Sequence, residues 1–168
     1  CAVYIPPEQV PHFLFRVKDS KKLSEKKREL LAEEIKERCD VGIGFVDNLV
    51  IDRINILQAT IQAMSFAVNK VKYVDYIIAD GNMNLDVCGY PYSSIINGDN
   101  LSLSIAAASI VAKVYRDDLM RTLHWVYPEY GWLKNKGYLT KEHQEAIKLY
   151  GLTDLHRKSF CRGLDKYI

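Results

Sequence analysis

The sequence predicts an α/β protein that folds as a single domain over residues 1–168. Short runs of β-favouring residues alternate with longer helical patterns, an order typical of helices packed on a central sheet. The 168 residues are 48% apolar and 26% charged, which suits one domain with a substantial core. An Ala-rich helix around residue 106 is slim enough to approach a sheet closely.

The chain opens with CAVYI, residues 1–5, which reads as a short buried strand. Three prolines follow, Pro6, Pro7 and Pro11, and proline both restricts the backbone and lacks an amide hydrogen. We therefore expect no regular structure in their neighbourhood.

A helix is predicted over residues 24–39. Ser24 is suited to the N-cap position, because its hydroxyl can accept a hydrogen bond from the first turn. Leu30, Leu31 and Ile35 supply the apolar stripe. The pattern predicts that this stripe faces the core.

The next strand and helix are predicted over residues 41–46 and 48–71. The strand VGIGFV contains two glycines, which indicate close packing or a bulge. The helix carries apolar residues at the three- and four-residue spacing of a buried face: Ile54, Leu57, Ile61, Met64 and Val68.

The second half of the chain is expected to hold two strands followed by helices. Residues 1–130 would form the sheet-and-helix core and residues 131–168 a C-terminal helical part. Thr140 is a candidate N-cap for the last helix, and Gly151 a candidate residue for its end. The predicted strands are residues 73–79 and 93–97, and the predicted helices are residues 103–127 and 141–150.

The composition argues against several classes of protein. No apolar run approaches the ~18 residues of a membrane span. The four cysteines and four histidines lack the spacing of a zinc site or a disulfide framework. We therefore expect reduced thiols, a cytoplasmic location and no membrane partner.

Positive charge gathers in two flanking segments. Residues 16–38 carry nine Lys or Arg against six Asp or Glu, and residues 131–168 carry eight against four. The segment between them, residues 39–130, carries six against ten. The flanks could bind a polyanion beside a carboxylate site, or they could be ordinary solvated helix faces.

Asp80 ends the strand-like run YVDYIIAD and is followed by Gly81. In an open α/β sheet, ligands bind beyond the ends of the strands, so this carboxylate could face a ligand. Asp-Gly is also a common turn pair. The stretch alone leaves both interpretations open.

Asp117 lies 37 residues later, deep in the helix predicted over residues 103–127. The Ala-rich turns before it would press this face towards the sheet. The alternative is an exposed pair with Lys113, one turn earlier on the helix. Asp118 points about 100° away and should face solvent.

Two carboxylates, one from a strand end and one from a helix, suit hard divalent cations such as Mg²⁺ or Mn²⁺. Two-metal phosphodiester cleavage uses one ion to activate water and another to steady the leaving oxygen. Such a site usually has more than two carboxylates. Asp86 and Asp99 are the remaining local candidates, although Asp99 is better placed as a turn or cap residue.

Several motifs, in the right order, make the chain resemble bacterial ribonuclease HII, the type 2 ribonuclease H family. The motifs run through nearly the whole chain: DSKKLS (19–24), IDRINILQAT (51–60), IIADGN (77–82), GDNLSLSIAAASIVAKVYRD (98–117), NKGYLTKEH (135–143) and LHRKSF (155–160).

The resemblance implies a ribonuclease H-like fold, with a central mixed sheet flanked by helices and a C-terminal helical region that binds substrate. It also implies that Asp80 and Asp117 are catalytic carboxylates that bind Mn²⁺ or Mg²⁺. Tyr138 would be the catalytic-site aromatic beside the scissile ribonucleotide. The partner would be an RNA–DNA hybrid or a duplex DNA containing ribonucleotides, bound by a monomer.

The chain departs from the family pattern in two places. The family's D-E-x-G-R-G strand and turn, which supplies two more carboxylates and contacts ribose 2′-hydroxyls, does not occur in this sequence. Asn97 stands where the family usually has Lys before Gly-Asp, which removes one positive charge near the substrate phosphates.

Other residues are candidates for contacts with substrate. The 2′-hydroxyl distinguishes RNA from DNA, and Tyr138 could stack on the sugar or bond near it. Lys21 and Lys136 are candidate phosphate contacts, and Lys21 could equally be solvated. His143 and the His156–Arg157 pair are better suited to structural or backbone-contacting roles than to catalytic ones.

Three functions follow from these features. The leading one is an endoribonuclease that cleaves the RNA strand of a hybrid, or at embedded ribonucleotides, leaving 3′-hydroxyl and 5′-phosphate ends. The second is a truncated, catalytically impaired nucleic-acid-binding form. The third is a signalling domain that accepts phosphate on Asp80, although the chain lacks the acidic pair and strand-end lysine that such a domain needs.

Overall fold

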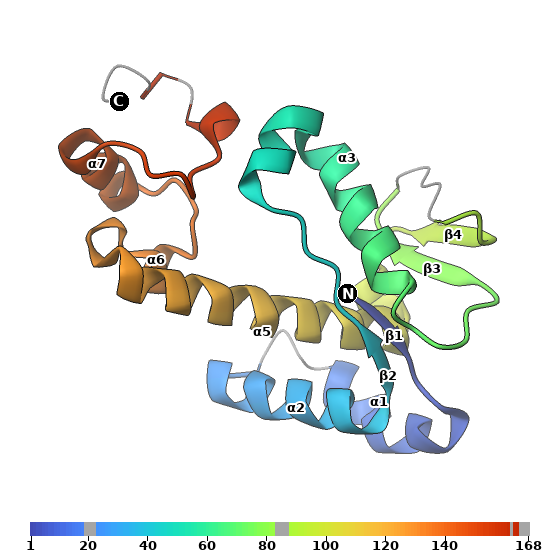
Figure 1. Ribbon diagram of the computed structural model, residues 1–168. Helices are drawn as coiled ribbons and strands as arrows, with labels where there is room; N and C mark the ends of the chain where they lie inside the picture. Colours follow the sequence, from blue (N-terminus) through green and yellow to red (C-terminus); the bar gives the residue numbers. More distant parts are fainter. Residues whose placement is uncertain (19–22, 83–87, 162, 165–168) are drawn as a thin grey trace. The chain divides into compact units, whose positions relative to one another are not determined.

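The structure, a computed structural model, describes residues 1–18, 23–82, 88–161 and 163–164. The chain divides into two compact units, and neither is a single stretch of sequence (Figure 1). The first unit comprises Cys1–Val46 and Leu57–Val114, and the second Asp47–Ile56 and Tyr115–Ile168. The expectation of one domain, with its core ending near residue 130, stays a prediction.

The strands lie in the first unit and form two pairs. Strand β1 (Ala2–Tyr4) is antiparallel to β2 (Asp40–Gly42), and β3 (Ile77–Asp80) is parallel to β4 (Tyr92–Ile95). The α/β class and the mixture of strand directions are confirmed. Among the described residues, however, the strands form two separate two-stranded sheets.

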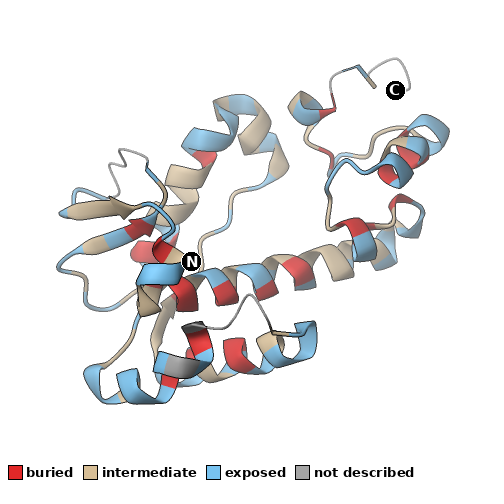
Figure 2. Cartoon of the chain, turned by 180° about the vertical axis from the view of Figure 1, so that it is seen from behind, coloured by how far each residue is buried: buried red, intermediate tan, exposed pale blue. Residues whose placement is uncertain are grey.

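Three helices enclose the main core of the first unit. They are α1 (Val10–Lys18), α2 (Glu25–Arg38) and the first half of α5 (Leu103–Val126). Figure 2 shows buried residues in red along α2 and α5. The largest fully buried side chains of this core are Phe13, Val17, Ile35 and Val111. Ala106 and Ala107 are also buried, as expected of the slim part of the helix.

Helix α2 confirms the predicted helix, including its N-cap. The Ser24 hydroxyl accepts a hydrogen bond from the Lys27 amide. Leu31 and Ile35 are buried, but Leu30 is 61% exposed, so its assignment to the buried stripe was wrong. Leu30 and Leu31 are about 100° apart on the helix, and only one of them can face the core fully.

The expectation that the prolines exclude regular structure was also wrong. Pro7 opens the 3₁₀ turn η1 (Pro7–Gln9), and Pro11 is the second residue of α1. The first turn of a helix makes no use of its amide hydrogens, so proline is tolerated there.

Helix α3 (Asn48–Val68) is interrupted at Asn55, whose backbone is left-handed with φ 70° and ψ 164°. This break divides the predicted helix: its first turns belong to the second unit and the remainder to the first. Leu57, just after the break, is 44% exposed, so the prediction that it belongs to the buried face was wrong.

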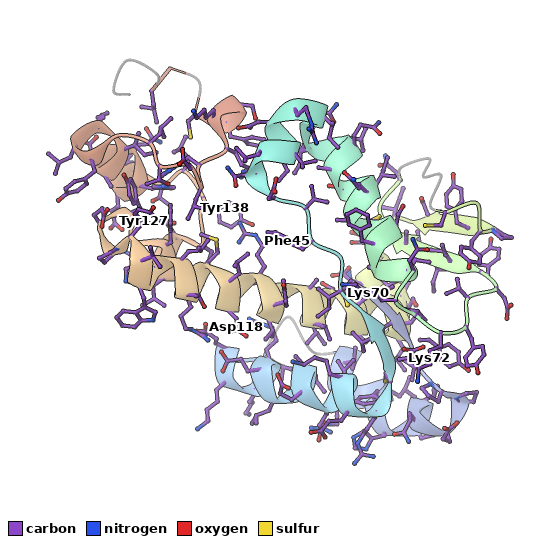
Figure 3. All side chains as sticks on the ribbon, in the orientation of Figure 1. Phe45, Lys70, Lys72, Asp118, Tyr127 and Tyr138 are labelled. Carbon is purple, nitrogen blue, oxygen red and sulfur yellow. The ribbon has the colours of Figure 1, made fainter. Side chains whose placement is uncertain are left out.

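The two glycines around β2 pack directly on α3, as their presence predicted. A Cβ atom on Gly42 would lie 1.9 Å from the Ala67 carbonyl oxygen, and one on Gly44 would lie 1.8 Å from that of Ala63. Lys70, at the end of this helix, donates a hydrogen bond to the Ile43 carbonyl, and the Lys72 amide donates one to Asp40 (Figure 3).

The second unit has its own core, built from the end of α5 and three short elements. Helix α6 (Trp132–Asn135), helix α7 (Lys141–Tyr150) and the turn η3 (Pro128–Tyr130) enclose buried Tyr130, Trp132 and Ile147. Thr140 caps α7 by accepting a bond from the His143 amide, as predicted, and Gly151 ends this helix.

Candidate active site

Asp80 is the last residue of β3, and its exposed carboxylate is held by a neighbouring backbone amide. Its Oδ1 atom accepts a hydrogen bond of 2.8 Å from the amide of Gly98. Gly98 is buried and begins the short helix α4 (Gly98–Leu101). The predicted strand over residues 73–79 is shorter than expected, because β3 begins at Ile77. The strand nevertheless ends at this carboxylate.

The position of Gly98 depends on having no side chain. A Cβ atom there would lie 2.7 Å from Ile105 Cδ1 and 3.4 Å from Asp80 Oδ1. The preceding residue, Asn97, is exposed and left-handed with φ 56°. Asn adopts this conformation more readily than Lys, since its short polar side chain can hydrogen-bond locally. Asp99 lies in the first turn of α4, which agrees with the turn or cap role expected of it.

Asp117 and Asp118 are neighbours on α5 with opposite environments. Asp117 is only 6% exposed, so its carboxylate is not the exposed one considered as an alternative. Asp118 is exposed, as predicted, and forms an ion pair of 2.6 Å with Arg121 (Figure 3).

Tyr138 is 66% exposed and follows a backbone turn fixed by Asn135. The buried Asn135 side chain donates to the Tyr130 carbonyl at 2.7 Å and accepts from the Gly137 amide at 2.8 Å. Lys136 and Gly137 are consecutive left-handed residues, with φ 50° and 78°. This turn fixes where the Tyr138 backbone lies, a role of Asn135 that sequence reasoning missed.

Two buried histidines lie behind this turn. His143 Nδ1 donates to the Tyr138 carbonyl at 3.0 Å, and its Nε2 accepts from Trp132 Nε1 at 3.1 Å. His156 Nδ1 accepts from the Thr153 amide, so its proton is on Nε2, which lies 3.2 Å from His143 Nε2. Both rings are therefore neutral and serve to hold the segment, which supports the structural role proposed for them.

The pKa values of both histidines are lowered. Burial is the main cause at His143, opposed by the hydrogen bond to Tyr138. At His156, burial and then the neighbouring His143 lower the pKa from 6.5 to about 4.

The beginning of α3 is hydrogen-bonded to the C-terminal segment. Asn48 Nδ2 donates to the carbonyls of Asp154, at 2.7 Å, and of His156, at 3.2 Å. Asp52 accepts from the amides of Lys158, at 2.7 Å, and Ser159, at 3.1 Å, and from the Ser159 hydroxyl. Two separate sequence motifs thus form one structure, a contact that no local pattern could reveal.

Asp52 has a lowered pKa although burial alone would raise it. The hydrogen bonds from Ser159 and Lys158, together with the nearby charge of Arg157, outweigh the effect of burial. The side chain is therefore a stable carboxylate at the start of the turn η4 (Lys158–Phe160).

The predicted site residues are distributed over both units. Asp80 and Asn97 belong to the first, and Asp117, Lys136 and Tyr138 to the second. Lys21 and Asp86 lie outside the described residues. Carboxylate oxygens are the ligands that Mg²⁺ and Mn²⁺ prefer, so Asp80 and Asp117 suit these ions chemically. Within the described ranges, no three or more His, Cys, Asp or Glu side chains are grouped as a metal site.

Two further expectations concern the whole chain. The four cysteines, Cys1, Cys39, Cys88 and Cys161, are free. In the part of the chain that the structure describes, no helix has the length and apolarity needed to cross a membrane.

Comparison with known proteins gives a consistent result. The sequence model of the Ribonuclease HII family matches residues 1–163. The Ribonuclease HII of Clostridioides difficile (strain 630) is 52% identical over 152 residues, which are 88% of this chain and 58% of that protein. That of Rickettsia bellii (strain OSU 85-389) is 52% identical over 151 residues, which are 89% of this chain and 76% of that protein. The chain thus spans little more than half the length of the first of these relatives.

Solved structures show the same fold. The ribonuclease H2 of Pyrococcus horikoshii OT3 has a TM-score of 0.79 at 22% identity, covering 96% of this chain and 86% of that one. The structure of the PCNA:RNase HII complex from Archaeoglobus fulgidus contains a chain with a TM-score of 0.73 at 22% identity, covering 94% and 83%.

Proposed function

This chain belongs to the ribonuclease HII family, and from that premise we propose that it is an endoribonuclease. Its substrate would be the RNA strand of an RNA–DNA hybrid, or a ribonucleotide embedded in duplex DNA. Hydrolysis would leave 3′-hydroxyl and 5′-phosphate ends. The observation that carries the proposal is the 52% identity to two members of the family across nearly nine-tenths of the chain.

Asp80 and Asp117 are the residues that we assign to Mg²⁺ or Mn²⁺. A divalent ion held by carboxylates supplies Lewis-acid activation and neutralises charge that develops on the phosphodiester. Asp80 is suited to this task because the Gly98 amide engages only one of its two oxygens in a described hydrogen bond. Gly98 is thus a positioning residue for Asp80.

Tyr138 is the residue that we assign to the sugar of the scissile ribonucleotide. Its ring is exposed while its backbone is fixed on both sides, by Asn135 and by His143. A rigidly placed aromatic side chain can recognise the ribose 2′-hydroxyl, which is the local difference between RNA and DNA. Lys136 and Lys21 would contact phosphates. Asn97 would also contact a phosphate, but it lacks the positive charge of the lysine that the family usually has at this position.

The assignment of the carboxylates is tested by three matched substitutions. Asp80→Asn and Asp117→Asn should each lower Mn²⁺-dependent cleavage of a labelled hybrid by at least about a hundredfold, since a metal ligand loses its charge. Asp118→Asn is the control, because its side chain is exposed and pairs with Arg121. The assay should use a chain that carries the D-E-x-G-R-G segment. Retained cleavage in either of the first two variants would contradict the assignment of that residue.

A catalytically impaired binding form is the second candidate, favoured by one observation. The D-E-x-G-R-G motif, which resemblance to the family associates with two further carboxylates, occurs nowhere in the 168 residues. The test is to compare this chain with one extended by that segment, at equal protein concentration. We expect both chains to bind the hybrid and only the extended chain to cleave it. Equal cleavage by the two chains would rule out the catalytically impaired form.

Family membership leaves the phosphate-accepting signalling function without support. We retain the remaining expectations as parts of the proposal: a monomer in the cytoplasm that acts on hybrid or ribonucleotide-containing duplexes.

A further inference from the structure

We propose that Arg116 and Arg157 form a phosphate-binding site around Tyr138, and that Asp52 positions Arg157 within it. All four residues belong to the second unit. The ligand would be the sugar-phosphate backbone of the duplex, so the inference rests on the proposed function. It adds Arg116 to the substrate contacts and gives Arg157, a candidate backbone contact by sequence, a defined place and a positioning residue.

Arg116 lies against the turn that carries Tyr138. Its guanidinium carbon is 5.3 Å from the centre of the Tyr138 ring, a cation–π distance. The same guanidinium lies beside Gly137, because a Cβ atom on that glycine would be 3.7 Å from Arg116 Nη2. Arg116 is half-buried, so part of its surface still faces solvent next to the exposed tyrosine. Figure 3 shows Tyr138 in the segment that follows α6.

Arg157 brings a second positive charge to the same place. Its guanidinium carbon lies 3.9 Å from the centre of the Phe160 ring. Burial lowers the pKa of Arg157, and the nearby charge of Arg116 lowers it further, while Asp52 and Tyr138 act in the opposite direction. The positive charges of the two guanidinium groups thus oppose each other. The backbone also brings Arg157 towards Tyr138, because the neighbouring His156 ring lies 3.2 Å from His143, whose Nδ1 bonds the Tyr138 carbonyl.

The charge of Asp52 offsets this repulsion at Arg157 only in part. Among the described residues, neither Arg116 nor Arg157 forms an ion pair. The closest acidic candidate, Asp52, directs its oxygens to the Lys158 and Ser159 amides and to the Ser159 hydroxyl. Two half-buried guanidinium groups whose donors take part in no described ion pair are suited to bind an anion, and arginine binds phosphate through paired N–H donors.

Asn48 and Asp52 together keep Arg157 in place, because each bonds the backbone on one side of it. On one side, the His156 carbonyl accepts from Asn48. On the other, the Lys158 amide donates to Asp52. Arg157 therefore sits between two residues that are fixed to the beginning of α3. Without Asp52, the turn η4 would lose the acceptor of its first two amides, and the direction of the Arg157 side chain would change.

The site is tested by the salt dependence of binding to a fluorescein-labelled RNA–DNA hybrid in EDTA, where no metal supports cleavage. Each phosphate contact contributes about 0.9 to the slope of log Kd against log salt concentration. Arg116→Gln and Arg157→Gln should each weaken binding about tenfold and reduce that slope by about one. Arg121→Gln is the control on the same helix, since Arg121 is already paired with Asp118, and both quantities should stay at the wild-type value.

Two further variants separate charge, geometry and positioning. Arg116→Lys should keep the slope but lose affinity, because Lys retains the charge without the paired donors. Asp52→Asn should reduce the slope in the wild-type background and not in the Arg157→Gln background, a coupling that a merely structural role would not produce. Far-ultraviolet circular dichroism and urea unfolding verify that each variant is folded.

The outcomes distinguish this site from the proposed activity. Unchanged slopes in both Gln variants, or no binding of the hybrid by the wild-type chain, would overturn the site. Metal-dependent cleavage by the extended chain together with unchanged slopes would leave the activity standing and refute only the site. Reduced slopes, together with no cleavage by the extended chain, would support the site and refute the activity.

Discussion

At the scale of single residues, neighbouring side chains of the same chemistry have different environments. Asp117 is buried and Asp118 is exposed, although they are adjacent on α5. Successive helical residues point about 100° apart, so one of two adjacent aspartates can face inward while the other faces water. The carboxylate that would bind a metal and its matched control are therefore supplied by the same turn.

The histidine pair makes the stability of the protein depend on pH. The pKa of His156 is about 4 in the folded chain, and unfolding returns it to an ordinary value near 6.5. Below about pH 6.5 the unfolded chain takes up a proton that the folded chain does not take up until about pH 4. The stabilisation is complete above pH 6.5 and falls as the pH drops towards 4, by up to about 3 kcal/mol.

Urea unfolding between pH 7.5 and 4 measures this effect. His156→Asn should be less stable at pH 7.5, because the contact with His143 is lost, but its stability should vary less with pH. A pH dependence as steep as that of the wild type would show that another group is responsible.

At the scale of elements, α3 and the segment around β2 pack backbone against backbone. Gly42 and Gly44 leave no room for a side chain, because the carbonyl oxygens of Ala63 and Ala67 occupy the positions that Cβ atoms would need. A backbone carbonyl cannot move away as the end of a flexible side chain can. The register between this segment and α3 is therefore set by the two glycines.

Gly44→Ala should lower the free energy of unfolding by about 3 kcal/mol or more, because the added carbon would lie 1.8 Å from an oxygen atom. Gly89→Ala is the comparison. No described residue lies within 4 Å of a Cβ atom there, but its φ of 71° is strained for alanine, so we expect a loss of only about 1 kcal/mol. Equal losses in urea unfolding would contradict the role of packing at Gly44.

The elements also show what a sequence can predict. Helix α2 and its cap at Ser24 follow from local signals, and the same holds for Thr140 and α7. The partners of Asp52 do not, because they lie more than 100 positions further along the chain. Asp80 could be selected from its place at a strand end, whereas the amide of Gly98 that holds it becomes visible only in the folded chain.

At the scale of the whole molecule, the two units interrupt each other along the sequence. The second unit needs Asp47–Ile56 as well as the C-terminal third of the chain. Asn48 alone contributes two hydrogen bonds to carbonyls more than 100 residues away. The integrity of the C-terminal segment therefore depends on a short stretch at the end of the first third of the chain.

Asn48→Ala should loosen residues 153–160 without affecting the first unit. Losing about 1 kcal/mol of hydrogen bonding should raise hydrogen–deuterium exchange there about fivefold. Peptides from α2 should exchange at the wild-type rate. Asn69→Ala is the control, since that exposed residue uses only its backbone amide in a described hydrogen bond. Faster exchange that is uniform over the chain would instead indicate global destabilisation.

The link between Asp52 and Ser159 also has a consequence for the order of folding during synthesis. The ribosome makes the chain from its N-terminus, so α3 emerges long before its acceptors and donors at residues 154–159 exist. The ribosome must add 106 further residues after Asp52 before this side chain can bond to Lys158. Nascent chains paused before residue 150 should therefore leave residues 47–56 open to proteases, and the second unit should form only as translation ends.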